Sequence, residues 1–365
     1  MSERSLVLKV LNGETHERKP WFADLSYLYS AMQARGELED KYTGDEGYLQ
    51  FHKDMGAGIC FYAPFLWKEE YINDVKFNQY INNGYMISTY DTPKGSIKSV
   101  QTYSPETFSW AYKEHYIKTV NDLEIMLYIY ENRKFSTNYT EFEKIDMLWG
   151  DYGIAVAIAP ISVAPLQTLL ARWAGIEKTV ELFMDHPIMF DKTIIELQKA
   201  DDKIFEIIAK SPARLIEFAE NLSGDITGRT LFEMYNMPYY KKRISQLHEA
   251  GKYVSIHIDG TLSSCLPLLG ECGFDVAEAV TPAPIGDIEV EGLREYAGKD
   301  IIIWGGIPGA LFSERYDNNM FENHVKNVLN IFKDDCGFVL GVADQVPPDA
   351  VISRVKRVCE LVNTI

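Results

Sequence analysis

The second half of the chain repeats one pattern of hydrophobic and polar positions. Short apolar runs, rich in valine, isoleucine and phenylalanine, are each followed by a polar or Gly/Pro turn and then by a stretch of helical periodicity. Strands are predicted at 153–161, 213–220, 253–259, 274–280, 300–307 and 337–342. Helices are predicted after them at 166–190 with 191–209, 239–250, 262–271, 288–296, 321–332 and 349–361. Strands that are apolar on both faces and alternate with helices are typical of a parallel sheet.

Two further apolar runs lie upstream, at 21–24 and 58–64, and bring the number of predicted strands to eight. Eight parallel strands close naturally into a barrel. We therefore predict a single α/β domain over residues 1–365 with the fold of a (β/α)8 (TIM) barrel. In such barrels the active site lies where the strands reach their carboxyl ends.

The stretch 71–144 interrupts this rhythm. Residues 85–90 and 97–103 flank the sequence Asp91-Thr92-Pro93-Lys94-Gly95, which predicts a β-hairpin with a Pro/Gly turn. No linker rich in glycine, serine or proline separates this stretch from its neighbours. We therefore expect an insertion near the barrel mouth rather than a separate domain.

Composition narrows the range of partners. The chain has 365 residues, 46% of them hydrophobic, and a formal net charge of −17. Such a charge opposes binding to nucleic acid or to anionic membranes, and no apolar run approaches the roughly 20 residues that span a bilayer. Five cysteines without a signal-peptide pattern favour a reducing, cytoplasmic location. The sequence leaves the oligomeric state open, and a homodimer is one option.

Polar residues end three consecutive predicted strands. Glu220 ends the run from 213, His257 and Asp259 end the run from 253, and Glu278 ends the run from 274. Neighbouring strands lie about 4.8 Å apart, so these groups can converge on one cation. A histidine with two carboxylates and an open position is a catalytic zinc pattern. A lone histidine at a strand end is usually structural, but here carboxylates end both flanking strands.

The metal ligands predicted in this way are His257, Glu220 and Glu278, and His257 is also a catalytic candidate. Asp259 has three open roles, as a ligand, as a partner that orients His257, or as a general base. Asp24 and Asp344 follow the first and last predicted strands, and each is a candidate for ligation, for proton donation, or for a capping or turn role. Aromatic residues near strand ends suit a flat apolar substrate. The predicted substrate-binding residues are Tyr27, Tyr62, Trp67, Trp304 and Asp344.

Several of these motifs together resemble the uroporphyrinogen decarboxylase superfamily, from about residue 21 onward and most clearly after 154. They are the His-Ile-Asp-Gly run at 257–260, the run 278–287, Trp-Gly-Gly-Ile-Pro-Gly at 304–309, the turn 341–348, and Glu220-Asn221 followed by 237–240. Individually the motifs are weak, and together they are specific. The resemblance implies a (β/α)8 barrel, in agreement with the strand rhythm.

One branch of that superfamily consists of porphyrinogen decarboxylases, which bind a polycarboxylate through arginines just after the first strand. Residues 21–35 of this chain offer only Arg35. The other branch consists of zinc-dependent methyltransferases that work with corrinoid proteins. Its thiol-specific members carry His-x-Cys-Gly at strand five and a cysteine after a glycine at strand eight. This chain matches His257 and Gly260, whereas Asp259 replaces the first cysteine and Val342 stands near the second.

Carboxylate ligands leave zinc a stronger Lewis acid than thiolates do, and such a metal would polarise the oxygen of a methyl ether. The resemblance therefore implies a zinc-dependent methyltransferase that demethylates a methoxylated, aromatic small molecule. Its methyl acceptor would be cobalamin on a separate corrinoid protein, because the chain lacks the Asp-x-His-x-x-Gly corrinoid motif. A metal-independent decarboxylase of the same fold is the alternative, and a non-catalytic binding barrel is the third hypothesis.

Overall fold

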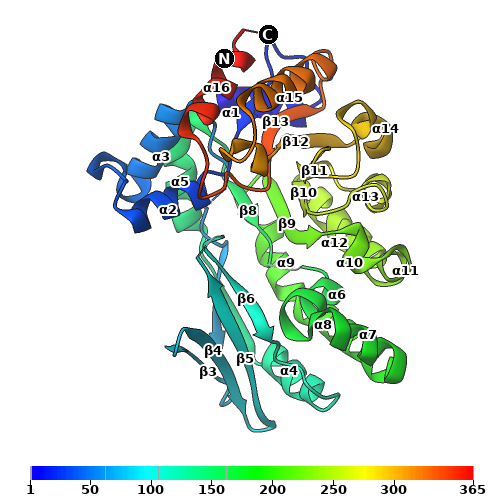
Figure 1. Cartoon of the computed structure of the whole chain (residues 1–365). Coiled ribbons are helices and arrows are strands. Elements are labelled where there is room, and N and C mark those ends of the chain that lie inside the picture. The colour runs from blue at the N-terminus through cyan, green and yellow to red at the C-terminus, as the bar shows by residue number, and fades with distance from the viewer. Residues whose placement is uncertain (1, 62, 106, 161–162, 365) are drawn as a thin grey trace.

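A parallel sheet forms the centre of the molecule in the computed structural model, which describes residues 2–61, 63–105, 107–160 and 163–364 (Figure 1). Seven strands lie in the order β1-β13-β12-β11-β10-β9-β8, and every neighbouring pair is parallel. Their bounds are β1 (Trp21–Phe22), β8 (Val156–Ile158), β9 (Leu215–Leu222), β10 (Tyr253–Ile258), β11 (Val276–Val280), β12 (Ile302–Pro308) and β13 (Phe338–Ala343). The alternation of strands and helices predicted from the sequence is confirmed.

Within the described residues of the strand predicted at 58–64, only isolated bridges form, at Gly58 and Ile59. Gly58 bridges to Phe22 and Ile59 bridges to Gly153, both in parallel orientation. The N–H of Gly58 donates to the carbonyl of Trp21 at 2.9 Å, and the N–H of Ile154 donates to the carbonyl of Ile59 at 3.1 Å. This segment therefore contacts the chain at both edges of the seven-stranded sheet.

Helices pack along the sheet, with α12 on β10 and α15 on β12 (Figure 1). The longer helices are α1 (Glu3–Leu11), α2 (Ser26–Arg35), α3 (Gly44–Met55), α5 (Tyr139–Trp149), α7 (Gly175–Asp185), α8 (Pro187–Ala200), α9 (Asp202–Ala209), α12 (Met237–Glu249), α15 (Asn318–Ile331) and α16 (Ile352–Val362). Shorter ones are α6 (Pro165–Thr168), α10 (Gly224–Thr227), α11 (Arg229–Leu231), α13 (Leu266–Cys272) and α14 (Leu293–Ala297). No helix of the described residues is long and apolar enough to cross a membrane.

Helix α1 packs against the inner residues of the sheet. Val7, Val10 and Leu11 are buried in one cluster with side chains from most of the parallel strands. The members from the strands include Phe22, Val156, Leu215, Val276, Ile302, Trp304 and Val339. Arg4 fixes the helix by donating to the carbonyl of Gly153 at 2.6 Å and by pairing with Asp146. This apolar layer lies beneath the polar residues described below.

The stretch 71–144 forms a lobe of its own β-structure. The predicted hairpin is confirmed, as β4 (Tyr85–Thr92) and β5 (Gly95–Ser104) pair antiparallel across Pro93-Lys94. Strands β3 (Lys76–Asn82) and β6 (Ser109–Glu114) extend it to a four-stranded sheet, while β2 (Trp67–Tyr71) pairs with β7 (Arg133–Thr137).

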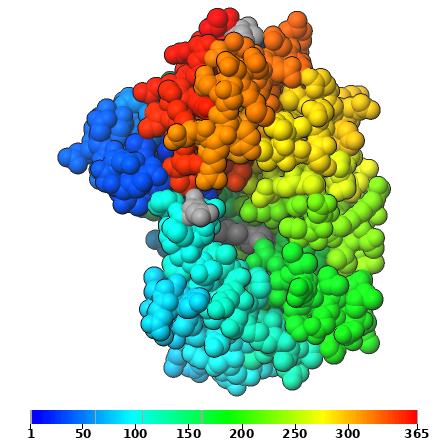
Figure 2. Space-filling view, viewed as in Figure 1, coloured from blue at the N-terminus to red at the C-terminus, as the bar shows by residue number. Residues whose placement is uncertain are grey.

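Helix α4 (Asp122–Glu131) and helices α6 to α8 share a second buried core with this lobe. In the space-filling view the molecule is hollowed between the cyan lobe and the yellow-to-red segments (Figure 2).

Candidate metal centre

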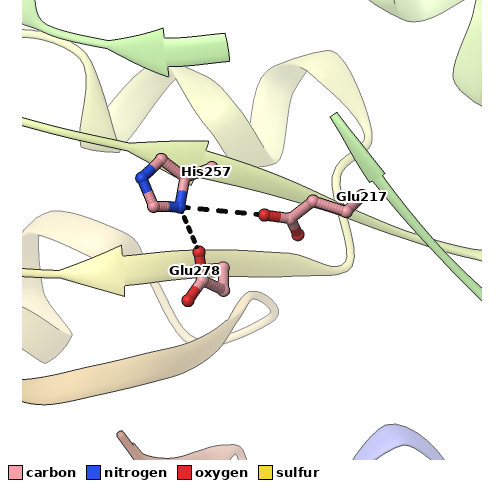
Figure 3. Close-up of side chains that lie close together, drawn as sticks. All are labelled: Glu217, His257 and Glu278. Carbon is pink, nitrogen blue, oxygen red and sulfur yellow. Dashed lines mark hydrogen bonds and ion pairs between the residues drawn. The ribbon is translucent and has the colours of Figure 1, made fainter. Parts of the chain in front are cut away.

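Three side chains from neighbouring strands meet on one face of the parallel sheet (Figure 3). Glu217 on β9, His257 on β10 and Glu278 on β11 each offer a ligand atom, and these atoms all lie within 4.8 Å of one another. The Nδ1 atom of His257 lies 2.6 Å from Oε2 of Glu278 and 3.8 Å from Oε1 of Glu217. Both carboxylates are almost fully buried.

Strand register places these groups together. His257 is the direct partner of Glu278, and Ser255 is the direct partner of Glu217. Side chains alternate between the two faces of a strand, so Ser255 and His257 share one face. The intervening Ile256 belongs to the main hydrophobic core on the other side. The hydroxyl of Ser255 also donates to Oε2 of Glu217, which fixes that carboxylate beside the histidine.

Electrostatics favour a positive charge at this point. Burial raises the pKa of Glu217 well above its ordinary value, and the charge of Glu278 raises it further. Burial alone would lower the pKa of His257, but Glu278, Glu217 and Asp344 outweigh it and raise that pKa to about 10. The acidic groups around His257 thus favour the cationic form of its imidazole.

The structure brings together two of the three predicted ligands, His257 and Glu278, and adds Glu217, which sequence reasoning missed. Glu220 is not a member of this group. Its Oε1 accepts a hydrogen bond from the N–H of Ala164 at 2.8 Å, and burial raises its pKa to about 8. The sequence did carry a signal for Glu217, because it lies two positions after the inner-layer residue Leu215 and so shares its face.

Of the other polar candidates, Asp344 lies nearest to His257. Its Oδ1 is 3.8 Å from Nε2 of His257, and its side chain is half exposed. Burial and the charges of Asp259 and Glu278 raise the pKa of Asp344, while His257 opposes this. Asp344 has a φ of +66°, so the backbone holds this side chain in an uncommon conformation at the end of β13.

Asp24 and Asp259 form local turns. Oδ1 of Asp24 accepts from the N–H of Ser26 at 2.9 Å, at the start of α2. Burial raises the pKa of Asp24 to about 6, with Asp344 and Glu278 adding to the rise. Asp259 is exposed, and its carboxylate accepts from the N–H of Gly260. Its side chain is therefore free to face an incoming molecule.

The aromatic candidates lie in different surroundings. Tyr27 is half-buried and lines a cavity described below. Trp67 begins β2 and packs in the main core beside Phe65. Trp304 is 3% exposed and packs on Phe22 in the layer that α1 covers, so it lies beneath the polar group. Tyr62 lies outside the described residues.

Two cavities adjoin the ends of the strands. The first, of about 950 Å³, is lined by Glu220, Asn221 and Asp259 together with Tyr112 and His115 of the lobe. We call it the β9 cavity.

The second, of about 700 Å³, is lined by Tyr27, Asp259 and Asp344 together with Thr107 and Phe108 of the lobe. We call it the β13 cavity. Asp259 and Gly260 line both cavities, and the lobe contributes residues to both.

The donor set fits a divalent metal. One imidazole and two buried carboxylates match the nitrogen and oxygen ligands of catalytic zinc, which keeps a position open for substrate. Nδ1 of His257 faces both carboxylates, whereas Nε2 faces Asp344. Glu217, His257 and Glu278 would hold the ion, and Asp344 would orient the imidazole through its second nitrogen.

Comparisons with known proteins identify a family and a similar fold. A family model described as Uroporphyrinogen decarboxylase (URO-D) matches residues 112–365. Among solved structures, a methyltransferase from Methanosarcina mazei is similar over 100% of this chain and 98% of its own, with a TM-score of 0.63 and 13% identity. A D-psicose 3-epimerase reaches a TM-score of only 0.36, with 9% identity over 62% of this chain and 82% of its own. A search of curated protein sequences finds no match.

Proposed function

Because the chain belongs to the uroporphyrinogen decarboxylase family, we propose that it is a zinc-dependent methyltransferase acting on a methoxylated, aromatic small molecule. The methyl group would pass to the cobalamin of a separate corrinoid protein. The observation that carries this proposal is the buried group of Glu217, His257 and Glu278. The similarity in fold to a methyltransferase over the whole chain is consistent with it.

A closed (β/α)8 barrel needs one strand more than the seven that pair in parallel. We propose that residues 58–60 take the second position of a closed (β/α)8 barrel, because they hydrogen-bond to the chain at both edges of the sheet. The side chain of Phe22 supports this, since a Cβ on Gly58 would lie 2.8 Å from its ring. A side chain at this position would therefore press on the ring of Phe22.

Zinc bound to this group would act as a Lewis acid on the ether oxygen and weaken the bond to the methyl carbon. The chain's own residues have separate tasks in the proposal. Glu217 and Glu278 balance the charge of the site, and Ser255 holds Glu217 in place. Asp344 lies at the mouth within 3.8 Å of His257, and its raised pKa suits it to hold a proton for the leaving oxygen.

Substrate entry is proposed through the β13 cavity, which Asp344 and Tyr27 line. The lobe residues Thr107 and Phe108 would cover a flat substrate there and reduce its contact with water. Asp259 reaches both cavities and would meet either the substrate or the incoming corrinoid. Trp67 and Trp304 would support the site from the core rather than contact the substrate.

A metal-independent decarboxylase is the second candidate, because Arg35 and Arg315 line the β13 cavity. Both arginines already have acidic neighbours, Arg35 with Glu37 at 2.9 Å and Arg315 with Asp349 at 3.4 Å. A substrate rich in carboxylates would have to displace these pairs. This favours the methyltransferase.

The proposed location is the cytoplasm, because all five cysteines are free and three of them are buried. Reduced thiols are the ordinary state in that compartment.

The decisive experiment has two readouts. Elemental analysis of the purified protein after zinc supply is expected to give one zinc per chain, and His257→Ala is expected to lose it. Methyl transfer to cob(I)alamin from a panel of methoxylated aromatic compounds is then expected to depend on that zinc. A protein that takes up no zinc, or whose His257→Ala variant stays fully active, would falsify the proposal. Carbon dioxide release without zinc would favour the decarboxylase.

A further inference from the structure

The outer edge of β3 is an unpaired strand edge. Within the described residues, β3 (Lys76–Asn82) pairs with β4 and ends the four-stranded sheet. All seven of its residues are exposed. In Figure 1 it lies at the outer side of the lobe, away from the parallel sheet. Backbone donors and acceptors on such an edge are open to another strand.

This edge lacks the features that usually prevent strand pairing. Natural edge strands carry prolines, bulges or charges, lysine above all. β3 has no proline, its pairing with β4 is regular, and its single charge, Lys76, stands at its first position. The following residues, Phe-Asn-Gln-Tyr-Ile-Asn, are uncharged, and Phe77, Tyr80 and Ile81 are large and exposed.

The turn after β3 fixes which backbone groups face outward. Asn83 and Gly84 have φ angles of +50° and +78°, and they join Asn82 to its direct partner Tyr85 in a two-residue hairpin. The residues that flank such a turn exchange hydrogen bonds with each other. Because this pattern alternates along an antiparallel pair, the N–H and C=O groups of Phe77, Gln79 and Ile81 point to the outer edge.

We infer that β3 pairs antiparallel with β3 of a second copy of this chain, about a two-fold axis that passes beside Gln79. In this register Gln79 faces Gln79 of the second copy, and Phe77 faces Ile81. Each facing pair joins residues whose backbone groups point outward, so about six hydrogen bonds form. Moving the axis to Phe77 or Ile81 would shorten the pairing, so the register at Gln79 uses the edge most fully.

Side chains agree with this register. Phe77 and Ile81 are 40% and 66% exposed, which is high for residues on the face that packs toward Tyr90. Aromatic and β-branched residues that face each other across strands stabilise a sheet. The two-fold axis creates this pair twice and covers both apolar side chains in both copies. Each chain of the inferred dimer keeps its own complete metal centre, so the dimer does not depend on the proposed function.

The first test measures the mass of the full-length protein in solution by sedimentation or light scattering at about 100 µM, because an interface of this size is at the weak end of the usual range. The chain, of 41.7 kDa, is expected to give twice this mass. Gln79→Pro removes an outward N–H without removing a bond to β4, and Ile81→Lys places a charge in the interface. Each is expected to raise the dissociation constant at least tenfold.

A matched control changes the opposite edge of the same sheet. Ala111→Lys puts a lysine on the exposed edge strand β6 and is expected to leave the dimer intact. A wild-type monomer at this concentration, or a dimer that survives both β3 variants, overturns the inference. Loss of the dimer in Ala111→Lys as well overturns it too, because the effect would then not be specific to β3.

A second test addresses the register. Phe77→Glu and Ile81→Lys are each expected to be monomeric alone, but their mixture is expected to form a heterodimer. In that heterodimer the glutamate of one chain faces the lysine of the other, while the second facing pair is unchanged. A mixture that stays monomeric while the wild-type chain is dimeric contradicts the axis at Gln79.

Discussion

Two glutamates three positions apart on β9 have different surroundings. Glu217 lies beside His257 and Ser255 inside the sheet, whereas Glu220 accepts a hydrogen bond from the backbone of Ala164. Both are buried, and burial raises the pKa of both carboxyl groups. Burial and charge therefore do not distinguish the proposed ligand from its neighbour, but position relative to the histidine does.

This difference gives a prediction for metal binding. Glu217→Gln is expected to weaken zinc binding at least about 100-fold, since loss even of a residue that only supports a ligand costs 10- to 100-fold. Glu220→Gln is the matched control, as it makes the same change on the same strand and is expected to keep its zinc. Competition with a zinc indicator measures both affinities. If Glu220→Gln loses zinc affinity and Glu217→Gln keeps it, Glu220 is the ligand instead.

Sequence reasoning selected His257 and Glu278 because each is a polar residue near the carboxyl end of an apolar run, on β10 and on β11. It chose Glu220 over Glu217 because it assumed that β9 ends in the same way. The pairing of β9 with β10 instead shifts register after Ile256, and Asn221 has a φ of +47°. Such an irregularity depends on the packing of neighbouring strands, and a count of alternating residues does not show it.

His52 gives a prediction for the dependence of stability on pH. Its ring is buried, and Nδ1 lies 3.3 Å from the carbonyl of Ala57. Burial lowers the pKa of His52 to about 4, against an ordinary value of 6.5. The folded protein thus binds this proton less readily than the unfolded chain does. Its contribution to stability is complete above pH 6.5 and is lost as the pH falls through 4.

The total loss from this group is expected to be about 3 kcal/mol. The measurement is urea unfolding between pH 7 and pH 4 for the wild-type protein and for His52→Gln, which has no proton to gain in this range. The variant is expected to lose less stability over the same interval. Equal losses in the two proteins would assign the pH dependence to other groups.

At the scale of elements, the predicted parallel strands after residue 150 correspond to β8–β13, with ends shifted by a few residues. The predicted helix at 166–190 is instead divided into α6, a π-helical segment at 169–173 and α7. Gly175, with a φ of +76°, marks the break, and Pro187 begins α8. The apolar pattern runs on through these breaks because both sides of them face the same second core.

The lobe was predicted only as a hairpin. Its remaining strands, β3, β6, β2 and β7, are mostly exposed or half-buried, so they lack the clear alternation of buried apolar and exposed polar residues that identifies a strand from sequence.

Gly305 gives a prediction at this scale, because β11 and β12 approach each other closely at this residue. It has a φ of +149°, and a Cβ there would lie 2.6 Å from the backbone N and O of Val280. Gly305→Ala is therefore expected to lower the free energy of unfolding by at least about 2 kcal/mol. Gly298→Ala is a useful comparison, since its φ is also positive but no atom lies within 4 Å of the added Cβ.

Urea unfolding of the two variants separates the cost of backbone strain from the cost of the contact with Val280. A loss in Gly305→Ala no larger than in Gly298→Ala would show that β11 and β12 move apart easily.

At the scale of the whole molecule, a buried ion pair connects the lobe to helices α8 and α12. Arg133 on β7 lies 3.7 Å from Asp201, which follows α8, and Tyr239 of α12 donates to the same carboxylate at 2.8 Å. The guanidinium of Arg133 also stacks 3.9 Å above the ring of Tyr130. The lobe is thus attached to α8 and α12 in part through this buried charge.

Arg133→Met is expected to destabilise the protein by about 3 kcal/mol, because it leaves Asp201 buried without its ion-pair partner. Lys134→Met changes the next residue, which is exposed, and is expected to have an effect below about 0.5 kcal/mol. Thermal and urea unfolding measure both. If the two variants lose equally little stability, the attachment of the lobe depends on its apolar core instead.

Helix α1 has a consequence for how the protein is made. It precedes every strand of the parallel sheet in the chain, yet the residues that cover Val7 and Val10 lie on strands as late as β13. During translation this helix therefore emerges long before its binding surface exists, and its apolar side stays open to chaperones until β13 has left the ribosome. The layer beneath the polar residues is thus completed only when a late strand reaches an early helix.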